Sequence, residues 1–289
     1  MTAEHIKRAA AALKAARPAY KEILEFYEDL CLAQEASKED IVLEPLEIPE
    51  DILAIKRKEG FPLISTKAFS IDKKASEALL KVLCGFAGKA NEILALSGNR
   101  LLETLKRGTL DASMLFSKIL DDDDGAFWDE AAKIADIPAA VIAFMTYSSV
   151  RPSLSVRAEQ MVTYLDNSAS WEKGYCPVCG NAPALAMLRD QGQRFLICGF
   201  CGHQWTAIRV FCPFCENRDQ KQLHYFYSEQ EKEYRVHACM GCKKYIKTVD
   251  VRDLARPVHP FLEQVSTLHL DMLAEEQGLK SGLPLWLQT

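Results

Sequence analysis

Eight of the ten cysteines in this sequence form four Cys-x-x-Cys pairs, and these pairs are the residues best suited to chemistry. Two residues between thiolates let one tight turn present both sulfurs to a single ion, and a hairpin can bring a second turn opposite. The first two pairs are separated by 18 residues and the last two by 23. The spacing predicts two metal sites of four thiolates each, with the ligands Cys176, Cys179, Cys198, Cys201, Cys212, Cys215, Cys239 and Cys242.

Sequential grouping of the pairs is the simplest arrangement, although the residues leave other groupings open. Gly180 and Gly202 follow the second cysteine of the first two pairs, where a tight turn favours a positive φ. Glu216 and Lys243 occupy the equivalent positions in the last two pairs, which are less well suited to that backbone angle. The first site is therefore expected to be slightly better formed than the second.

The identity of the metal stays open, because Zn²⁺ and rubredoxin-type iron both accept four thiolates in a tetrahedron. A site closed by four cysteines has no open coordination position, so metal-assisted hydrolysis is not expected and no catalytic residue is assigned. A thioredoxin-type dithiol would need one pair beside a βαβ unit, which four pairs among short strands do not provide. His203 lies close to Cys201, but packing beside a filled site is its simpler role.

Short β-prone runs separated by turns surround the four pairs. Each half of the region reads pair, strand, turn, strand, pair, strand, which indicates a duplicated metal ribbon with ribbon 1 at about 171–210 and ribbon 2 at about 211–250. A ribbon of about 40 residues rarely buries enough apolar surface to fold unaided, and bound metal can supply the deficit. Strands are expected at Ala184–Leu188, Arg194–Ile197, Trp205–Val210, Leu223–Tyr227, Tyr234–His237 and Tyr245–Val249.

The residues before the cysteine pairs have apolar side chains at helical spacing, which predicts six to eight helices. Breaks between them are expected at Pro18, Pro45–Pro49, Gly60–Pro62, Gly98, Asp121–Gly125 and Pro138. Cys31 and Cys84 lie alone in these stretches and are expected to be buried packing residues. After the ribbons, Pro260–Gly278 predicts a helix that buries Phe261 and Met272 on one face. The expected fold is α+β: an all-helical domain (1–168), a duplicated rubredoxin-like or zinc-ribbon β module (169–252), and a C-terminal helix and tail packing back on the body (253–289).

The composition is that of an ordinary globular chain, with 289 residues, 48% hydrophobic and 26% charged residues, and a formal net charge of −5. No apolar run reaches the roughly 18 to 20 residues that a membrane helix needs. The N-terminal 20 residues lack the apolar core of a secretory signal, so a cytoplasmic location is expected. In a reducing cytoplasm, paired cysteines are more readily metal ligands than disulfides.

Several blocks of residues resemble the formate dehydrogenase accessory proteins of the FdhE type. The resemblance covers about 110 residues and is carried mainly by the cysteine pairs and their flanks. The blocks are Trp171–Gly180, Trp205 with Arg209 and Cys212–Glu216, Leu223–Tyr225, Cys239–Lys247, and more weakly Leu270–Asp271 with Gln277–Gly278.

The resemblance implies a cytoplasmic, non-enzymatic assembly factor for formate dehydrogenase. Such a factor would bind iron in two rubredoxin-like sites and contact the catalytic subunit of a respiratory formate dehydrogenase. The eight cysteines of the predicted sites would hold the iron, while the helical half and the final helix would supply partner surface.

Two alternatives from other functional classes remain. Four-cysteine ribbons also occur in nucleic-acid-binding proteins, which are expected to be clearly basic. Between Trp171 and Asp250 there are 11 Lys/Arg and 8 Asp/Glu, and two divalent tetrathiolate sites would bring this module to about −1. Nucleic acid is therefore an unlikely partner. A rubredoxin-like electron-transfer protein is the second alternative, but it would leave the helical half without a purpose.

Overall fold

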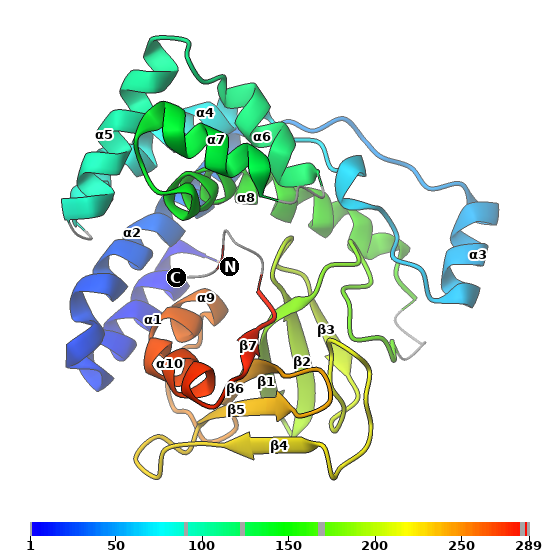
Figure 1. Ribbon diagram of the computed structural model, residues 1–289. Coiled ribbons are helices and arrows are strands. Elements are labelled where there is room, and N and C mark those ends of the chain that lie inside the picture. The colour runs from blue at the N-terminus through cyan, green and yellow to red at the C-terminus, as the bar shows by residue number, and fades with distance from the viewer. Residues whose placement is uncertain (1, 90–91, 122–124, 167–170, 284–286, 288–289) are drawn as a thin grey trace. The chain divides into compact units, whose positions relative to one another are not determined.

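The computed structural model describes residues 2–89, 92–121, 125–166, 171–283 and 287, and the chain divides into two compact units (Figure 1). The helical unit comprises Met1–Pro45, Thr66–Arg157 and Leu285–Thr289. The sheet unit comprises Leu46–Ser65 and Ala158–Pro284. Because 167–170 lie outside the described residues, the domain boundary expected at 168 and 169 stays a prediction.

Eight α-helices lie within the described part of residues 2–166, in agreement with the expected six to eight. Seven of them contribute to the helical unit, and α3 belongs to the sheet unit. None of the described helices is both long enough and apolar enough to cross a membrane. The helices are α1 (Ala3–Ala16), α2 (Lys21–Ser37), α3 (Glu50–Glu59), α4 (Lys73–Phe86), α5 (Glu92–Lys106), α6 (Ala112–Leu120), α7 (Ala126–Ala135) and α8 (Ala139–Met161).

The helix break expected at Gly98 is wrong, because Gly98 lies inside α5. A Cβ atom at this position would approach the carbonyl oxygen of Cys84 in α4 to 2.8 Å, so glycine permits close packing of the two helices. Cys84 and Cys31 are each 3% exposed, and burial raises the pKa of both thiols to about 12. Their environment agrees with the packing role expected for them.

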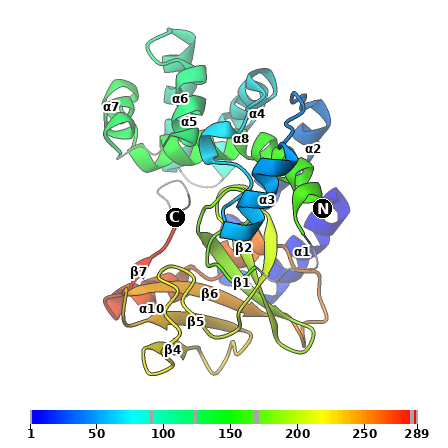
Figure 2. The ribbon, with the colours of Figure 1, turned by 90° about the vertical axis from the view of Figure 1, so that its right-hand side faces the viewer.

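All six expected strands form, and with a short seventh strand they build one sheet in the order β3-β2-β1-β6-β5-β4, with β7 beside β6 (Figure 2). Within each ribbon, neighbouring strands are antiparallel. The strands are β1 (Pro183–Arg189), β2 (Gln193–Cys198), β3 (Gln204–Ala207), β4 (Leu223–Phe226), β5 (Tyr234–Cys239), β6 (Lys244–Asp250) and β7 (Lys280–Ser281).

The two ribbons are joined through a parallel pairing of β1 with β6, in which Ala186 lies opposite Thr248 and Leu188 opposite Asp250. The first strand of ribbon 1 thus pairs with the third strand of ribbon 2. Each ribbon contributes its three strands in the same spatial order, so the sheet repeats one unit side by side. This arrangement agrees with a duplicated ribbon.

The C-terminal region contains two helices, α9 (Pro260–Val265) and α10 (Leu268–Glu276), where the sequence predicted one continuous helix. The hydroxyl groups of Ser266 and Thr267 donate to the carbonyl oxygen of Glu263 and end α9. Because α10 starts anew after this interruption, a different set of its side chains is buried than in one continuous helix. Met272 is therefore 64% exposed, contrary to expectation, whereas Leu270 and Ala274 are buried.

The two helices lie on one face of the sheet (Figure 1), and Leu270 and Ala274 of α10 belong to the apolar core of the sheet. The carboxylate of Asp271 in α10 accepts hydrogen bonds from the Tyr245 hydroxyl at 2.8 Å and the buried Lys247 ammonium at 2.5 Å. The fully buried Glu263 of α9 similarly accepts from Arg256 and the Tyr234 hydroxyl. These polar contacts fix the helices on ribbon 2, since each pairs groups that would be costly to bury alone.

Candidate metal centre

Each Cys-x-x-Cys pair lies in a turn of the same construction. In three turns the amide of the first cysteine donates to the carbonyl oxygen of the residue five positions later at 2.9 Å. In the fourth turn, the first cysteine and the residue five positions later are paired between β5 and β6. This shared backbone pairing closes each turn around its two cysteines. The pairs of residues are Cys176 with Asn181, Cys198 with His203, Cys212 with Asn217, and Cys239 with Lys244.

The residue after the second cysteine has a positive φ in all four turns, as the turn geometry requires. Gly180 and Gly202 both have φ near 76° without a steric penalty. Glu216 and Lys243 adopt φ of 56° and 57°, in a region that disfavours side chains with a Cβ atom. The turns of ribbon 2 therefore carry backbone strain that the turns of ribbon 1 avoid.

The eight sulfurs gather into two groups of four, and the groups follow the sequential order of the pairs. In the first group, Sγ of Cys176 lies 3.8 Å from that of Cys201, and Sγ of Cys179 lies 3.4 Å from that of Cys198. The corresponding distances in the second group are 3.6 Å for Cys212–Cys242 and 3.7 Å for Cys215–Cys239.

These distances fit a shared metal ion better than a disulfide. A disulfide bond is about 2.05 Å long, and no pair approaches that length. A tetrahedral ion bound to sulfur at about 2.3 Å places its ligands about 3.8 Å apart. Among the described residues, these are the two groups of His, Cys, Asp or Glu side chains able to share one ion. Both groups can therefore hold a tetrahedral metal ion.

The first group is enclosed, with all four cysteines at most 4% exposed. A segment from far earlier in the chain covers its first turn. The amides of Leu63 and Ile64 donate to the carbonyl oxygens of Pro177 and Val178 at 2.9 and 3.0 Å. The Tyr175 hydroxyl also donates to the Gly60 carbonyl oxygen at 2.8 Å. The sequence showed no sign that this segment belongs beside the first site.

The second group is more open than the first. Cys212 and Cys239 are buried, but Cys242 is only half-buried and Cys215 is exposed. Gly174, just before the first turn of ribbon 1, packs against the Cys212–Cys215 turn and donates its amide to the Glu216 carboxylate at 3.1 Å.

The electrostatic setting of the first group requires a cation if all four sulfurs are to be thiolates. Burial raises the pKa of Cys176 and of Cys201 well above the usual thiol value. At Cys198 burial acts in the same direction, but hydrogen bonds from the neighbouring cysteines lower the pKa well below the usual value. Four negative charges in so small a buried volume repel one another, and a bound ion removes that cost by replacing the protons.

At the second group, burial again opposes ionisation of Cys239, yet hydrogen bonds from the amides of Cys242 and Gly241 lower its pKa to about 7. In the first group, the amides of Phe200 and Cys201 donate to the sulfur of Cys198 at 3.3 and 3.4 Å. Backbone amides directed at sulfur stabilise thiolates, so the turns prepare their cysteines for metal binding.

Two asparagines at the sites were not identified from the sequence, although a signal was present. The first and third pairs both read Cys-Pro-x-Cys-x-Asn. The side-chain amide of Asn181 lies 3.6 Å from Sγ of Cys179, and that of Asn217 lies 3.9 Å from Sγ of Cys239. Comparing the duplicated halves would have revealed both.

Arg194 was also missed, because an arginine in a strand is usually a solvent-facing residue. Its side chain is only 2% exposed, and Nη1 donates to the carbonyl oxygen of Phe211 at 2.9 Å. Burial lowers the pKa of Arg194 to about 10, while Cys212 acts in the opposite direction. Arg194 therefore stays protonated at neutral pH and ties β2 to the residue preceding Cys212.

The histidines near the sites are not members of the two sulfur groups. His203 stacks on Trp205 with 6.5 Å between ring centroids, in agreement with a packing role. Burial, together with Arg194 and Arg235, lowers the pKa of His237 to about 3, so its ring is neutral at physiological pH.

Comparison with known proteins places both sulfur groups within two consecutive domains of one family. The family described as "FdhE, central domain" matches residues 175–209, and "FdhE, C-terminal domain" matches residues 210–286. The first range contains the first sulfur group and the second range contains the second group. Residues 175–286 are thus similar to both FdhE domains in order.

FdhE-type relatives align over different shares of their length. An FdhE homolog of Aquifex aeolicus is 38% identical over 112 residues, which are 37% of this chain and 39% of the relative. An FdhE protein of Salmonella paratyphi B is 31% identical over 44% of this chain and 42% of the relative. An FdhE homolog of Haemophilus influenzae is 24% identical over 87% of this chain and 83% of the relative. The chain thus spans less than half of two of these relatives.

The fold agrees with a solved FdhE structure over nearly the whole chain. The crystal structure of the FdhE protein from Pseudomonas aeruginosa matches with a TM-score of 0.68, and the alignment covers 99% of this chain and 96% of the Pseudomonas aeruginosa chain. Sequence identity in this alignment is 23%, so the likeness concerns the fold. The arrangement of a helical region followed by a sheet with two four-cysteine clusters is confirmed.

Proposed function

We propose that this chain is an accessory factor for the maturation of a formate dehydrogenase and that it binds two metal ions through its four Cys-x-x-Cys pairs. The observation that carries the proposal is the placement of two groups of four sulfurs, one in each of the matched FdhE domains. The eight cysteines would act as ligands. We assign no catalytic residue, because four thiolates leave no coordination position for a substrate.

Iron in rubredoxin-like sites is the proposed metal, with zinc as the chemical alternative. The residues present fit a tetrahedral ion, as the sulfur distances and the amides directed at Cys198 indicate. Bound iron would supply one-electron redox chemistry, while zinc would supply structure alone.

The proposed partner is the catalytic subunit of a respiratory formate dehydrogenase, and the proposed location is the cytoplasm, where thiolates stay reduced. An accessory role requires binding to a folding or cofactor-loading client, and not turnover of a substrate. This proposal makes the client's activity, rather than any activity of the chain itself, the quantity to measure.

Complementation in a strain that lacks this gene tests the proposal. The deletion strain should make formate dehydrogenase polypeptide with little activity, and the wild-type gene should restore it. Cys176→Ser and Cys215→Ser should restore less activity, because each removes one ligand from one site. Cys31→Ala, which alters a cysteine outside the sites, should complement as the wild type does. Normal formate dehydrogenase activity in the deletion strain would refute the proposed function.

A further inference from the structure

The two sulfur groups differ in how well they are shielded from incoming molecules. All four cysteines of the first group are buried, and the segment around Leu63 covers its first turn. In the second group Cys215 is exposed and Cys242 is half-buried. The second group also lies in turns where Glu216 and Lys243 hold strained backbone angles. The second group therefore differs from the first in the exposure of its cysteines and in the backbone strain of its turns.

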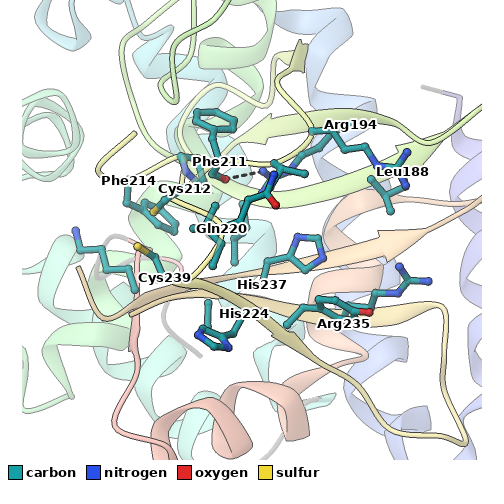
Figure 3. A pocket seen from close by; sticks show the side chains of 18 residues that line it. Leu188, Arg194, Phe211, Cys212, Phe214, Gln220, His224, Arg235, His237 and Cys239 are labelled. Atoms are coloured by element: carbon teal, nitrogen blue, oxygen red, sulfur yellow. Dashed lines mark hydrogen bonds between the residues drawn. The ribbon is translucent and has the colours of Figure 1, made fainter. Parts of the chain in front are cut away.

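A cavity of about 460 Å³ adjoins the second group, and Cys212 and Cys239 form part of its wall (Figure 3). Arg235 and His237 of β5 also line it, on the face of the strand opposite to the one that carries Val236 into the core. A molecule in this cavity would be next to two of the four sulfurs.

The side chains that line the cavity carry a positive excess. Arg194, Arg209, Arg235 and Lys244 are among them, and none of the lining residues is an aspartate or glutamate. The guanidinium group of Arg235 forms an ion pair with the Asp250 carboxylate at 3.2 Å. Arg209 is exposed to solvent. Fixed positive charges around a concave surface attract anions and raise their local concentration. The cavity thus favours the binding of a negatively charged ligand.

We propose that the second centre exchanges its metal ion through this cavity with an incoming anionic donor group, a carboxylate or thiolate, while the first centre retains its ion. The inference rests on the two metal sites of the proposed function. With a bound ion, each bond from the incoming donor to the ion would replace one metal–cysteine bond, and the released thiolate would take a proton from water. The ion would leave with the donor without a change of oxidation state.

Release of Zn²⁺ from the full-length chain, loaded with two equivalents, tests the inference. With the anionic chelator EDTA, one equivalent should leave at least about tenfold faster than the other, because only the second centre is accessible. Alkylation with iodoacetamide after the first equivalent has left, followed by peptide mass spectrometry, identifies the emptied centre. The label should lie on Cys212, Cys215, Cys239 and Cys242.

The role of the basic cavity is tested with Arg209→Gln and with 1,10-phenanthroline, a neutral chelator. Arg209→Gln should slow the fast phase with EDTA several-fold and leave the rate with 1,10-phenanthroline unchanged, because only the anion is attracted by charge. Arg107→Gln, an equal change of net charge at an exposed residue just after α5, is the matched control and should alter neither rate.

Three outcomes would overturn the inference: release of both ions in one phase, first-phase labelling of the cysteines of the first group, or equal EDTA rates for Arg209→Gln and Arg107→Gln. Each is distinguishable from failure of the proposed function. The zinc stoichiometry at the start tests the two sites themselves, and formate dehydrogenase activity in the deletion strain tests the accessory role.

Discussion

Lys243 and Glu216 show how a metal-binding turn constrains a single residue, since the backbone there adopts a positive φ whatever side chain is present. Lys243→Gly should stabilise the chain by about 1 kcal/mol, because glycine adopts this angle without a Cβ clash. Gly202→Ala, where a Cβ would meet no other atom, should destabilise it by a similar amount through strain alone. Denaturant unfolding of the Zn²⁺-loaded variants measures both, and equal stability of all three proteins would contradict the strain argument.

Gly174 provides a second test at a single residue. A Cβ there would lie 2.0 Å from the carbonyl oxygen of Pro213, inside the Cys212–Cys215 turn. Gly174→Ala should therefore cost about 1–3 kcal/mol or more and weaken zinc binding at the second site, because the backbone of the turn must move. Gly85→Ala in α4, where a Cβ has open space, is the control and should leave zinc binding unchanged. Unchanged zinc binding by Gly174→Ala would show that the turn relaxes freely.

Contacts between elements are tested at the Lys247–Asp271 pair, which joins β6 to α10. Asp271→Ala should cost about 3–5 kcal/mol, because it leaves the buried Lys247 ammonium without a counter-charge. Lys247→Met should cost less, since Asp271 is 23% exposed and keeps the Tyr245 hydroxyl as a donor. Thermal unfolding of the two single variants and the double variant measures this order. A smaller loss for Asp271→Ala than for Lys247→Met would contradict it.

Elements governed by local pattern were predictable from the sequence. All six expected strands form, because alternation and turn residues are local signals. The interruption of the last helix was not foreseen, because the hydroxyls of Ser266 and Thr267 are compatible with a continuous helix and only the structure shows them ending α9. Gly98 was misread for a related reason: its partner, Cys84, lies in another helix.

At the scale of the whole molecule, the sequence did not predict the contacts between segments that lie far apart in the chain. The grouping of the sulfurs follows the simplest reading of spacing, so the candidate sites were predictable as sets of residues. The parallel pairing of β1 with β6 and the backbone bonds from Leu63 and Ile64 join segments far apart in the sequence. The burial of Arg194 likewise depends on such packing. No periodicity or motif within either partner signals these contacts.

Removal of metal should affect the two units differently. The sheet unit contains both sulfur groups, whereas the helical unit contains neither and has its own apolar core. Chelation or acidification should therefore abolish the native packing of the aromatic residues in the sheet unit and preserve most helical signal, because protonated thiols no longer hold the ions. Near- and far-ultraviolet circular dichroism of the same sample measures both. Retention of the near-ultraviolet signal after complete metal loss would contradict this expectation.

Metal content of the full-length chain purified without oxygen, together with its visible spectrum, tests the central claim most directly. We predict two metal ions per chain for the wild type and one for each of Cys176→Ser and Cys215→Ser, with thiolate-to-iron absorption if the metal is iron. A wild-type protein with no bound metal, or with eight sulfurs of the two groups reacting as free thiols in the native state, would contradict the account.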